Sequence, residues 1–371
     1  MFFDEITKMG HEQVNFFSNP DVGLKSIVAI HDTTLGPALG GCRFLNYKSD
    51  EEALNDVLRL SQGMTYKAAV AGLNLGGGKA VIIGDPKELK SEGLFRAFGR
   101  FLQTLNGRYI TAEDVGTDVT DMEYVYMETP HVVGVAETSG GSGDPSPFTA
   151  MGVIQGMKAC LKEKRNSESF EGITVAVQGL GHVGYHLLRN LINENCKIIA
   201  TDISSGIISK VKDEFSQVEI VKNEEIYDVK CDIFSPNALG AVINDDTIPR
   251  LKCTIVAGAA NNVLKHPEDG LHLEKRGILY APDYAINAGG LMNVSIELEG
   301  YNQKRAVRMI RNIYYNLSRI FRIAKEDNIP TYLAADRLAE QRLTILRKIK
   351  AAYIGGTQSP RSIDRRRKHS I

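Results

Sequence analysis

Two lysines stand twelve residues apart, each beside an apolar run that is unusual for a charged side chain. Lys67 precedes the run 68–71 (AAVA), and Lys79 lies between the glycines 76–78 and the run 80–83 (AVII). Burial of a free ammonium is costly, and a neighbouring cation disfavours the charged amine further. We therefore expect Lys79 to act as a general base. A surface lysine without a role is the alternative.

A dinucleotide fingerprint lies in the middle of the chain. The apolar run 173–178 leads directly into Gly179-Leu180-Gly181-His182-Val183-Gly184 and a helical pattern, and Asp202 follows 18 residues after the last glycine. In this motif the glycines permit a tight turn, approach to the pyrophosphate and close packing of helix and strand, while the helix N-terminus binds phosphate. Asp202 would bind the ribose hydroxyls and repel a 2′-phosphate, which favours NAD over NADP. A glycine turn that binds nothing is the alternative.

The glycines before Lys79 do not form a phosphate-binding P-loop. That motif requires glycine where Leu73 stands and a magnesium-binding hydroxyl where Ala80 stands.

Asp114 follows a strand-like segment, 108–111, in a predicted loop. Alone it would be a turn residue. Beside two lysines and a hydride-accepting cofactor, it becomes a candidate proton carrier.

Strand and helix signals alternate around the lysines. Ser49 and Glu52 form a capping box, in which each side chain binds the other's free backbone N–H. We expect the helix that starts there to end at Gly63. Strands are predicted at 24–31 and 79–83. A further helix is marked by Leu94, Phe98, Phe101, Leu102 and Leu105.

The second half of the chain alternates between strands and helices, which implies a parallel, doubly wound sheet. Its predicted strands are 173–178, 197–201, 231–234, 254–257 and 278–281, and residues from about 303 to 350 are mostly helical. We thus predict an α/β protein with an N-terminal α/β substrate domain, a Rossmann NAD-binding domain and a cleft between them.

The segment 139–147 is rich in turn formers and marks a predicted domain boundary and hinge. The substrate-binding and catalytic domain is expected at 1–138, with a helix at about 330–350 packing back on it. The Rossmann domain is expected at 145–329, and a basic tail follows at 351–371.

The composition is that of a globular protein with room for two domains: 371 residues, 43% hydrophobic and 24% charged. No apolar stretch approaches the roughly 20 residues of a membrane span, and the N-terminus does not resemble a signal peptide. Five scattered cysteines argue against a disulfide framework and favour a cytoplasmic location. His182 and His186 have helical spacing but no evident third ligand, so we predict no metal site.

The net charge of −1 is unevenly distributed. From Arg347 onward eight lysines and arginines stand against one acid, Asp364, so the remaining body carries −8. A basic tail can bind nucleic acid, but an acidic body argues against that class of partner. We expect the tail to be a solvated terminus.

Long motifs along nearly the whole chain, to about residue 345, resemble the amino-acid dehydrogenase family of glutamate, leucine, phenylalanine and valine dehydrogenases. The motifs are 36–41 (GPALGG), 64–67 (MTYK), 75–79 (LGGGK), 112–117 (AEDVGT), 261–262 (NN), 281–284 (APDY) and 287–290 (NAGG). The resemblance implies a reaction in which an L-amino acid, water and NAD give a 2-oxo acid, ammonium and NADH.

The resemblance also implies roles for single residues. Lys67 should pair with the substrate carboxylate, Lys79 should activate the water that attacks the imine carbon, and Asp114 should move protons to and from the amino group. The other substrate-binding residues are Leu39, Gly40, Asn262, Leu291 and Val294, with the backbone of 287–290. The cofactor-binding residues are Gly179, Leu180, Gly181, His182, Val183, Gly184, Asp202, Thr149, Ala238, Ala257, Gly258, Ala259 and Asn261.

The resemblance favours a branched-chain substrate, leucine before valine and isoleucine. Glutamate enzymes have a lysine where Leu39 stands, so a glutamate side chain would lack a partner here. The segment 112–114 (AED) resembles leucine enzymes, whereas 41–43 (GCR) and Gly78 resemble phenylalanine enzymes. An aromatic substrate, phenylalanine or tryptophan, is therefore the alternative, and a catalytically silent NAD-binding regulator is the alternative from another class. The family also suggests a homo-oligomer, often an octamer.

Overall fold

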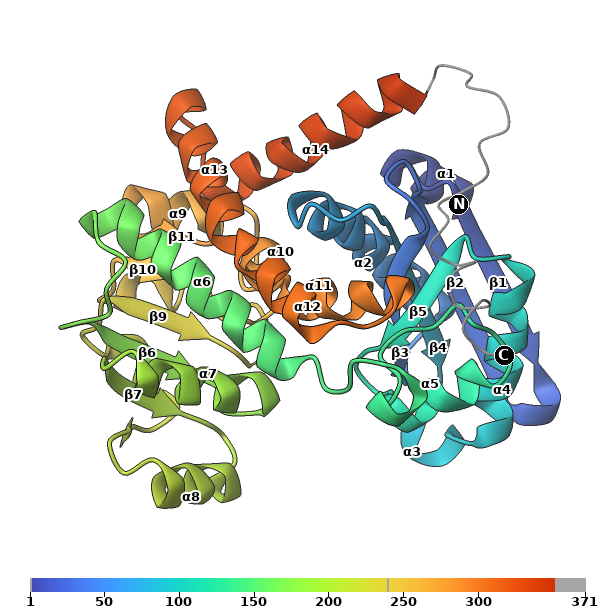
Figure 1. The fold of residues 1–371 in the computed structure, drawn as a ribbon, viewed down its shortest axis with the longest axis horizontal. Helices are drawn as coiled ribbons and strands as arrows, with labels where there is room; N and C mark the ends of the chain where they lie inside the picture. Colours follow the sequence, from blue (N-terminus) through green and yellow to red (C-terminus); the bar gives the residue numbers. More distant parts are fainter. Residues whose placement is uncertain (1, 239, 351–371) are drawn as a thin grey trace. The chain divides into compact units, whose positions relative to one another are not determined.

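The structure is a computed structural model that describes residues 2–238 and 240–350, and the chain divides into two compact units (Figure 1). Among the described residues, unit 1 comprises 2–144, 294–303 and 339–350, and unit 2 comprises Pro145–Asn293 and Lys304–Leu338. The first crossing between the units, after Asp144, falls within the turn-rich segment 139–147. The predicted basic tail, 351–371, lies outside the described residues.

Unit 1 is built on a sheet with the strand order β1-β2-β4-β3-β5. Its strands are β1 (Gln13–Asn19), β2 (Leu24–Asp32), β3 (Ala38–Leu45), β4 (Gly76–Ile83) and β5 (Tyr109–Glu113). Its helices are α1 (Phe2–Met9), α2 (Asp50–Val70), α3 (Pro86–Leu89), α4 (Glu92–Thr104) and α5 (Val119–Tyr126), with short 3-10 turns η1 (Pro20–Val22), η2 (Glu137–Ser139) and η5 (Ile296–Glu299). β3 runs parallel to β4 and β5, whereas β2 runs antiparallel to β1 and β4.

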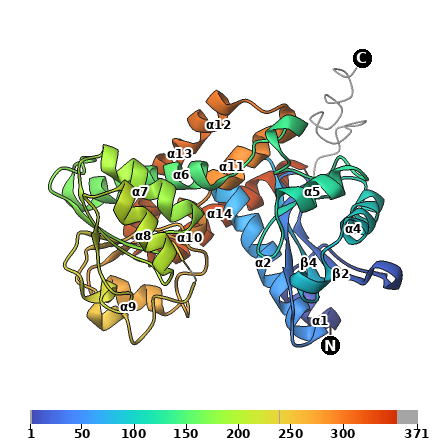
Figure 2. The ribbon, with the colours of Figure 1, turned by 90° about the horizontal axis from the view of Figure 1, so that it is seen from below.

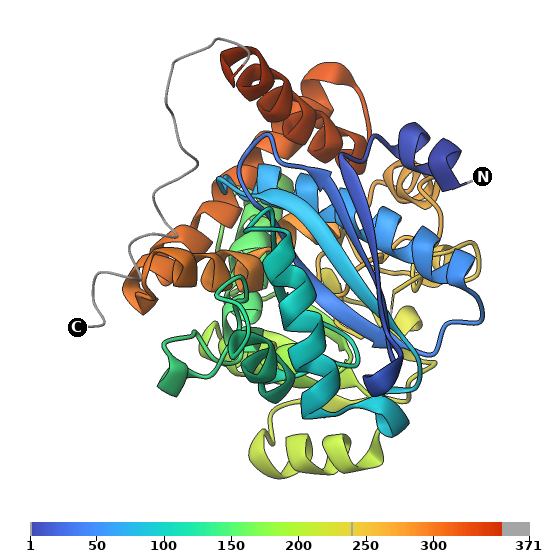
Figure 3. The ribbon, with the colours of Figure 1, turned by 90° about the vertical axis from the view of Figure 1, so that its right-hand side faces the viewer.

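The two faces of this sheet carry alternate residues of the same strands, as the period of two requires. Ile27, Ala29 and Val81 pack against α2 on one face. Val28, Ile30 and their alternating neighbours pack against α4 and α5 on the other. Figure 3 shows α2 and the teal α4 on opposite sides of the sheet. Both faces of the sheet are therefore buried, which explains the near-continuous apolar character of β2 and β4.

The start of α2 follows the capping prediction only in part. The Ser49 hydroxyl accepts a hydrogen bond from the Glu52 N–H at 3.2 Å. The Glu52 carboxylate, however, accepts from the Lys48 N–H at 2.7 Å, one residue before the position that the capping box predicts. Both backbone donors are still satisfied, so the helix begins at the predicted place.

The predicted end of α2 at Gly63 is wrong. The helix continues to Val70 because Thr65, Ala68 and other residues beyond Gly63 remain buried, and their packing outweighs the cost of an exposed glycine of about 1 kcal/mol. After the cap residue Ala71 the chain leaves the helix direction at Gly72, which has a φ of +77°. This extension places Lys67 in the last turn of α2.

The glycine run before Lys79 lies inside β4 rather than in a loop. A Cβ on Gly77 would lie 2.1 Å from the backbone nitrogen of Thr65, and a Cβ on Gly78 would lie 2.7 Å from the ring of Tyr109. The glycines therefore let α2 and the Tyr109 ring of β5 approach β4 closely. This close approach explains the run without any bound phosphate.

Unit 2 contains the parallel, doubly wound sheet that the alternating pattern predicts, with the order β11-β10-β9-β6-β7-β8. Its strands are β6 (Thr174–Gln178), β7 (Lys197–Thr201), β8 (Glu219–Ile220), β9 (Ile233–Pro236), β10 (Ile255–Val256) and β11 (Leu279–Tyr280). α6 (Ser146–Arg165) packs against α7 (His182–Asn193) and α13 (Asn312–Asp327), as Figure 2 shows.

The remaining helices of unit 2 are shorter. They are α8 (Ser205–Glu214), α9 (Asp269–Lys275) and α10 (Asp283–Ile286), with 3-10 turns η3 (Ile226–Asp228) and η4 (Ile248–Arg250). α11 (Gly289–Ser295), α12 (Gln303–Ile310) and α14 (Thr331–Lys350) each contain a point at which the chain passes from one unit to the other. In the described ranges, none of the helices combines the length and apolarity that a membrane crossing requires.

Candidate active site

Two of the predicted catalytic residues form an ion pair in unit 1. The Lys79 Nζ on β4 lies 2.8 Å from Oδ2 of Asp114, which directly follows β5. The Lys79 side chain is only 7% exposed. The same Asp114 oxygen accepts a hydrogen bond from Arg43 Nε at 3.0 Å. A partly buried carboxylate is thus shared between two cations, and it provides the partner that the buried ammonium of Lys79 needs.

The surroundings of Asp114 keep it ionised. Burial by itself acts to raise the pKa of this carboxyl, but the charges and hydrogen bonds of Lys79 and Arg43 outweigh it and lower the pKa to about 2. The carboxylate is therefore a permanent anionic partner of Lys79 at neutral pH. The sequence indicates two effects on Lys79, burial and a neighbouring cation. It does not indicate the carboxylate of Asp114 as an ion-pair partner.

Arg43 is a member of the site that the sequence motifs did not reveal. Its Nη1 binds Asp56 Oδ2 at 3.0 Å, and the Tyr47 hydroxyl donates to the same oxygen at 2.9 Å. Burial opposes the charge of Arg43, but Asp114 and Asp56 raise the pKa of the guanidinium overall. The signal for Arg43 is its place as a charged residue within an otherwise apolar strand, β3.

Glycines of β3 make room for this pair. A Cβ on Gly40 would lie 1.7 Å from the carbonyl oxygen of Gly78, and a Cβ on Gly41 would lie 2.9 Å from the Cβ of Asp114. Any larger residue would separate β3 from the residues that carry the ion pair. Gly40, a predicted substrate-binding residue, therefore has a structural role in the described residues.

The acidic neighbour of Asp114 was also missed. Burial, followed by the negative charges of Asp144, Asp118 and Asp114, raises the pKa of Glu113 to about 7. Glu113 ends β5, immediately before the ion pair. A group that titrates near neutral pH lies within one residue of the predicted proton carrier.

The other predicted substrate residues are divided between the units. Lys67 in α2, Leu39 in β3 and Val294 belong to unit 1, whereas Leu291 belongs to unit 2. Leu39 is 1% exposed and pairs in register with Gly77 and Ile110 on either side. Leu291 and Val294 are buried as well.

The fingerprint glycines of unit 2 occupy three different environments. Gly179 has a φ of +93°, and a Cβ on it would lie 2.7 Å from the Cβ of Ala238. A Cβ on Gly184 would lie 2.0 Å from the carbonyl oxygen of Gly179. Around Gly181, in contrast, no atom of the described residues outside the adjoining chain lies within 4 Å of the Cβ position. The first and third glycines thus serve the fold, and the second leaves open space.

The helix that follows the loop presents a free N-terminus. α7 begins at His182 with Gly181 as its N-cap, and no side chain of the described residues caps it. The first N–H groups of a helix have no partner within the helix, and the dipole there favours anions. With Gly181 open and His182 and Val183 in the first turn, the chemistry of this loop fits a pyrophosphate.

Asp202 lies at the end of β7, beside the loop. Its Oδ2 accepts from the Leu180 N–H at 2.7 Å, and its Oδ1 accepts from the Ser204 N–H at 2.8 Å. The carboxylate therefore holds the glycine loop in place. Two carboxylate oxygens offer about four acceptor positions, so the geometry leaves capacity for ribose hydroxyls.

Several residues predicted at the nicotinamide end gather in unit 2. Asn287 Nδ2 donates to Ala259 O at 3.1 Å and to Asn261 Oδ1 at 2.7 Å. Asn287 is 4% exposed, and its Oδ1 has no hydrogen-bond partner among the described residues. A Cβ on Gly290 would lie 2.6 Å from the hydroxyl of Thr149, which brings Thr149 to the same group.

The strand end beside this group is closely packed. Ala257 follows β10, and its N–H donates to Phe234 O at 3.0 Å. A Cβ on Gly258 would lie 2.1 Å from the carbonyl oxygen of Pro236. Asn262 has a φ of +51°, a left-handed conformation that asparagine adopts more readily than most residues. Such a conformation is found often at functional sites.

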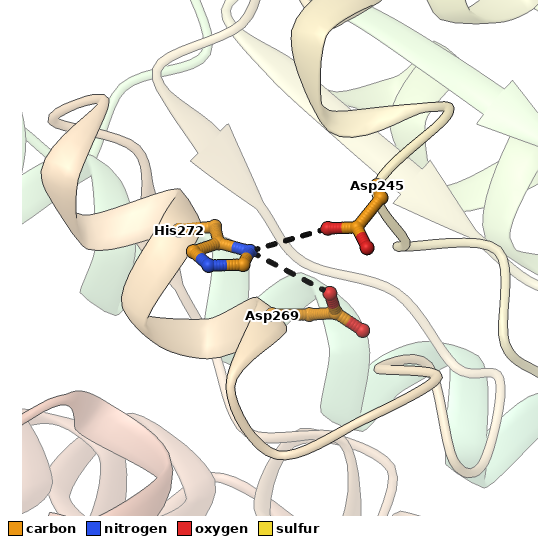
Figure 4. A group of neighbouring side chains, drawn as sticks. All are labelled: Asp245, Asp269 and His272. Atoms are coloured by element: carbon orange, nitrogen blue, oxygen red, sulfur yellow. Dashed lines mark ion pairs between the residues drawn. The ribbon is translucent and has the colours of Figure 1, made fainter.

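One group of potential metal ligands is present among residues 2–238 and 240–350. His272 Nδ1 lies 3.5 Å from Asp245 Oδ1 and 3.8 Å from Asp269 Oδ1 (Figure 4). Asp245 and His272 are exposed, and Asp269 Oδ2 accepts the His266 N–H at 2.7 Å. These contacts describe an ion-pair cluster at the start of α9. It includes neither His182 nor His186, and it shares no residue with the lysine site or the glycine loop.

Comparisons with known proteins agree with these motifs. The family model described as Glu/Leu/Phe/Val dehydrogenase, dimerisation domain, matches residues 11–131, and the model for Glutamate/Leucine/Phenylalanine/Valine dehydrogenase matches 140–213 and 208–344. A leucine dehydrogenase of Geobacillus stearothermophilus is 57% identical over 93% of this chain and 94% of its own.

A phenylalanine dehydrogenase of Caldalkalibacillus thermarum is 48% identical over 92% of this chain and 93% of its own. The crystal structure of L-tryptophan dehydrogenase from Nostoc punctiforme matches with a TM-score of 0.82 and 45% identity, over 94% of this chain and all of that one. The chain therefore belongs to the Glu/Leu/Phe/Val dehydrogenase family of amino-acid oxidoreductases, which act with a nicotinamide cofactor.

Proposed function

We propose that the protein catalyses the reversible, NAD-dependent oxidative deamination of L-leucine, with valine and isoleucine as further substrates. The products are the 2-oxo acid, ammonium and NADH. The observation that carries the proposal is the ion pair of the buried Lys79 and the partly buried Asp114, since it joins a base and a proton carrier in one place. The greater identity to leucine dehydrogenases, 57% against 48% for a phenylalanine dehydrogenase, supports the choice of substrate.

In this mechanism Lys67 pairs with the substrate carboxylate, and Asn262 with the backbone of 287–290 holds the remainder of the amino acid. The substrate amino group enters beside Asp114 and competes with Lys79 for the carboxylate. This exchange releases the Lys79 ammonium, which gives a proton to solvent, and the neutral amine then takes a proton from the water that attacks the imine carbon. Asp114, ionised at neutral pH because its pKa is about 2, passes protons to and from the leaving nitrogen.

When bound, a nicotinamide cofactor would supply the acceptor for the hydride of the substrate Cα. We propose NAD, bound through Gly179–Gly184, Asp202 and Ala238, with its reactive end at Thr149, Ala257, Gly258 and Asn261. An uncapped helix N-terminus and an open Gly181 support pyrophosphate binding there. The charge of Asp202 disfavours the 2′-phosphate of NADP.

The apolar character of Leu39 supports an aliphatic substrate. Its side chain is 1% exposed and lies between Gly77 and Ile110. A glutamate carboxylate placed against Leu39 would be buried without a partner, which is costly. A hydrophobic pocket discriminates by only about 1–3 kcal/mol per methylene, so overlapping branched-chain substrates are expected.

We further propose a homo-oligomer, an octamer in the first instance. The N-terminal family model is described as a dimerisation domain, and Phe16 on the sheet-edge strand β1 is 58% exposed. The mass of the native protein, from light scattering after size exclusion, tests this proposal.

The absence of disulfides among Cys42, Cys160, Cys196, Cys231 and Cys253 supports a cytoplasmic location.

Initial rates with leucine, valine, isoleucine, phenylalanine, tryptophan and glutamate test the function. NADH absorbance reports turnover, and each amino acid is assayed with NAD and with NADP. We expect the highest kcat/KM for leucine with NAD. A preference for an aromatic amino acid would favour the alternative substrate class that Gly41-Cys42-Arg43 suggests. NADH binding without turnover of any amino acid would indicate a regulator.

A further inference from the structure

A single turn connects the two predicted catalytic lysines. Residues 71–75 join the end of α2 to the start of β4, with Lys67 four residues before the turn and Lys79 four residues after it. Both lysines are therefore placed by the same short segment. A shift of this turn would move Lys67 and Lys79 relative to each other.

One guanidinium binds both sides of this turn. Arg342 on α14 donates from Nη1 to the carbonyl oxygens of Ala69 at 3.0 Å and of Ala68 at 3.3 Å, at the end of α2. Its Nη2 donates to Oδ1 of Asn74 at 3.1 Å, just before β4. The planar fork of arginine suits such two-sided binding, which a lysine ammonium cannot reproduce.

The negative end of α2 is the counter-charge of this arginine. Among residues 2–238 and 240–350, no carboxylate forms an ion pair with Arg342, although the side chain is half-buried. Burial lowers the pKa of the guanidinium. The carbonyls in the last turn of a helix carry partial negative charge and favour a cation. The arginine thus acts as a cap on the turn of α2 that contains Lys67.

Neighbouring side chains of α14 hold the same region. The Tyr66 hydroxyl, next to Lys67, donates to Glu340 Oε1 at 2.5 Å. Arg347 binds Asp32 at the end of β2. The segment of α14 around Arg342 is therefore attached to unit 1 on both sides, so Arg342 has a defined place from which to act.

We propose that Arg342 is a positioning residue that holds Lys67 and Lys79 in register for the substrate. It does not contact the reacting atoms, and it acts through the turn 71–75. The inference rests on the proposed function, in which Lys67 binds the substrate carboxylate. Loss of Arg342 then weakens amino-acid binding first, and the NAD site in unit 2 is unaffected.

The test compares Arg342→Ala and Arg342→Lys with the wild-type protein in steady-state assays. We expect both variants to raise the KM for L-leucine by about tenfold, since small misplacements of binding groups have large effects, while the KM for NAD stays within about twofold. The lysine variant keeps the positive charge but lacks the planar guanidinium. It therefore separates the effect of hydrogen-bond geometry on the KM from the effect of charge. Added guanidinium ion should partly restore the KM of Arg342→Ala.

A matched control comes from the same helix. Arg337→Ala removes an ion pair to Asp327 in unit 2 and should leave the KM for leucine unchanged. If the Arg342 variants lower Tm but keep the wild-type KM, the arginine only stabilises the fold and the proposal is wrong. Should Arg342→Ala fail to fold, Arg342→Lys and Asn74→Ala decide, and an unchanged KM in both overturns it.

Rates of the wild-type protein with the six amino acids distinguish a failure of the Arg342 proposal from a failure of the proposed function. If the protein turns over a different amino acid, the proposal of leucine fails. The same variants are then compared on the amino acid that the protein does turn over. A raised KM for that substrate still supports the positioning role of Arg342.

Discussion

The lysine site of unit 1 is built from charged side chains, whereas the glycine loop of unit 2 is built mainly from backbone groups. In unit 1, Lys79, Asp114, Arg43 and Asp56 form a chain of charges within about 3 Å of one another, each compensating the next. In unit 2, three of the six residues of the loop 179–184 are glycines, and the loop offers backbone N–H groups with the Asp202 carboxylate beside it. Proton transfer here uses charged side chains with partners, whereas pyrophosphate binding uses the free N–H groups and dipole of a helix N-terminus.

Glycines appear in both regions but serve different purposes. Gly40, Gly77 and Gly78 make room for other protein atoms, since a Cβ on each would lie within 3 Å of a neighbour. Gly181 has no such neighbour among the described residues. Of these four glycines, only Gly181 leaves space that a ligand could occupy.

The largest expected effect is in the charged site. Lys79→Ala should lower kcat by about a thousandfold, because the base that activates water is lost. NADH binding, measured by fluorescence titration, should stay at the wild-type level since the loop in unit 2 is untouched. Lys25→Ala, an exposed lysine on β2, is the matched control. Retention of most of the wild-type kcat would remove Lys79 from the mechanism.

Substitution of the second and of the third glycine of the loop, Gly181 and Gly184, should have different effects on stability and on NADH binding. Gly184→Ala should weaken NADH binding by about a hundredfold and lower Tm, because its Cβ would lie 2.0 Å from the Gly179 carbonyl. Gly181→Ala should keep the wild-type Tm and weaken NADH binding by about tenfold, since only the pyrophosphate comes close to that position. Equal losses of stability in both variants would contradict the distinction between packing and binding glycines.

A smaller effect is expected for cofactor choice. Asp202→Asn should reduce the preference for NAD over NADP by about tenfold, since one charge-assisted hydrogen bond and the repulsion of phosphate are lost. Asparagine keeps an acceptor for the Leu180 N–H, so the loop should remain in place. The measurement is kcat/KM with each cofactor. Equal use of NAD and NADP by the wild-type protein would show that this interpretation of Asp202 is wrong.

The smallest effect concerns stability in acid. The pKa of Asp114 lies at about 2 in the folded protein, below its ordinary value of 3.8, so its stabilising contribution is complete above pH 4 and is lost as pH falls towards 2. The advantage of the wild type over Asp114→Asn in the free energy of unfolding should therefore shrink by about 1 kcal/mol or more between pH 5 and pH 3. Urea unfolding at several pH values measures it.

Gly181→Ala provides the control for this titration. It changes no charge, so its stability relative to the wild type should be independent of pH. A constant difference between the wild type and Asp114→Asn over the same range would mean that the ion pair with Lys79 does not stabilise the fold.

Local patterns predicted most of the elements that carry the two sites. The strands β6 and β7 lie within a residue of their predicted bounds, because short apolar runs bounded by polar residues and turns leave few alternatives. The predicted end of α2 at Gly63 was wrong, because a glycine on the exposed face of a helix destabilises it only slightly when residues beyond it are buried. Burial of Thr65 and Ala68 depends on strands that come later in the chain.

The sequence by itself determined the family, the doubly wound sheet of unit 2, the glycine loop and the identity of Lys67, Lys79 and Asp114 as chemical candidates, because these depend on motifs that are local in the chain. Only the tertiary structure decided which charges compensate one another. Arg43 reaches Asp114 across 71 residues, and Arg342 reaches Ala69 across 273. Such contacts follow from strand order and helix packing, which no local pattern encodes.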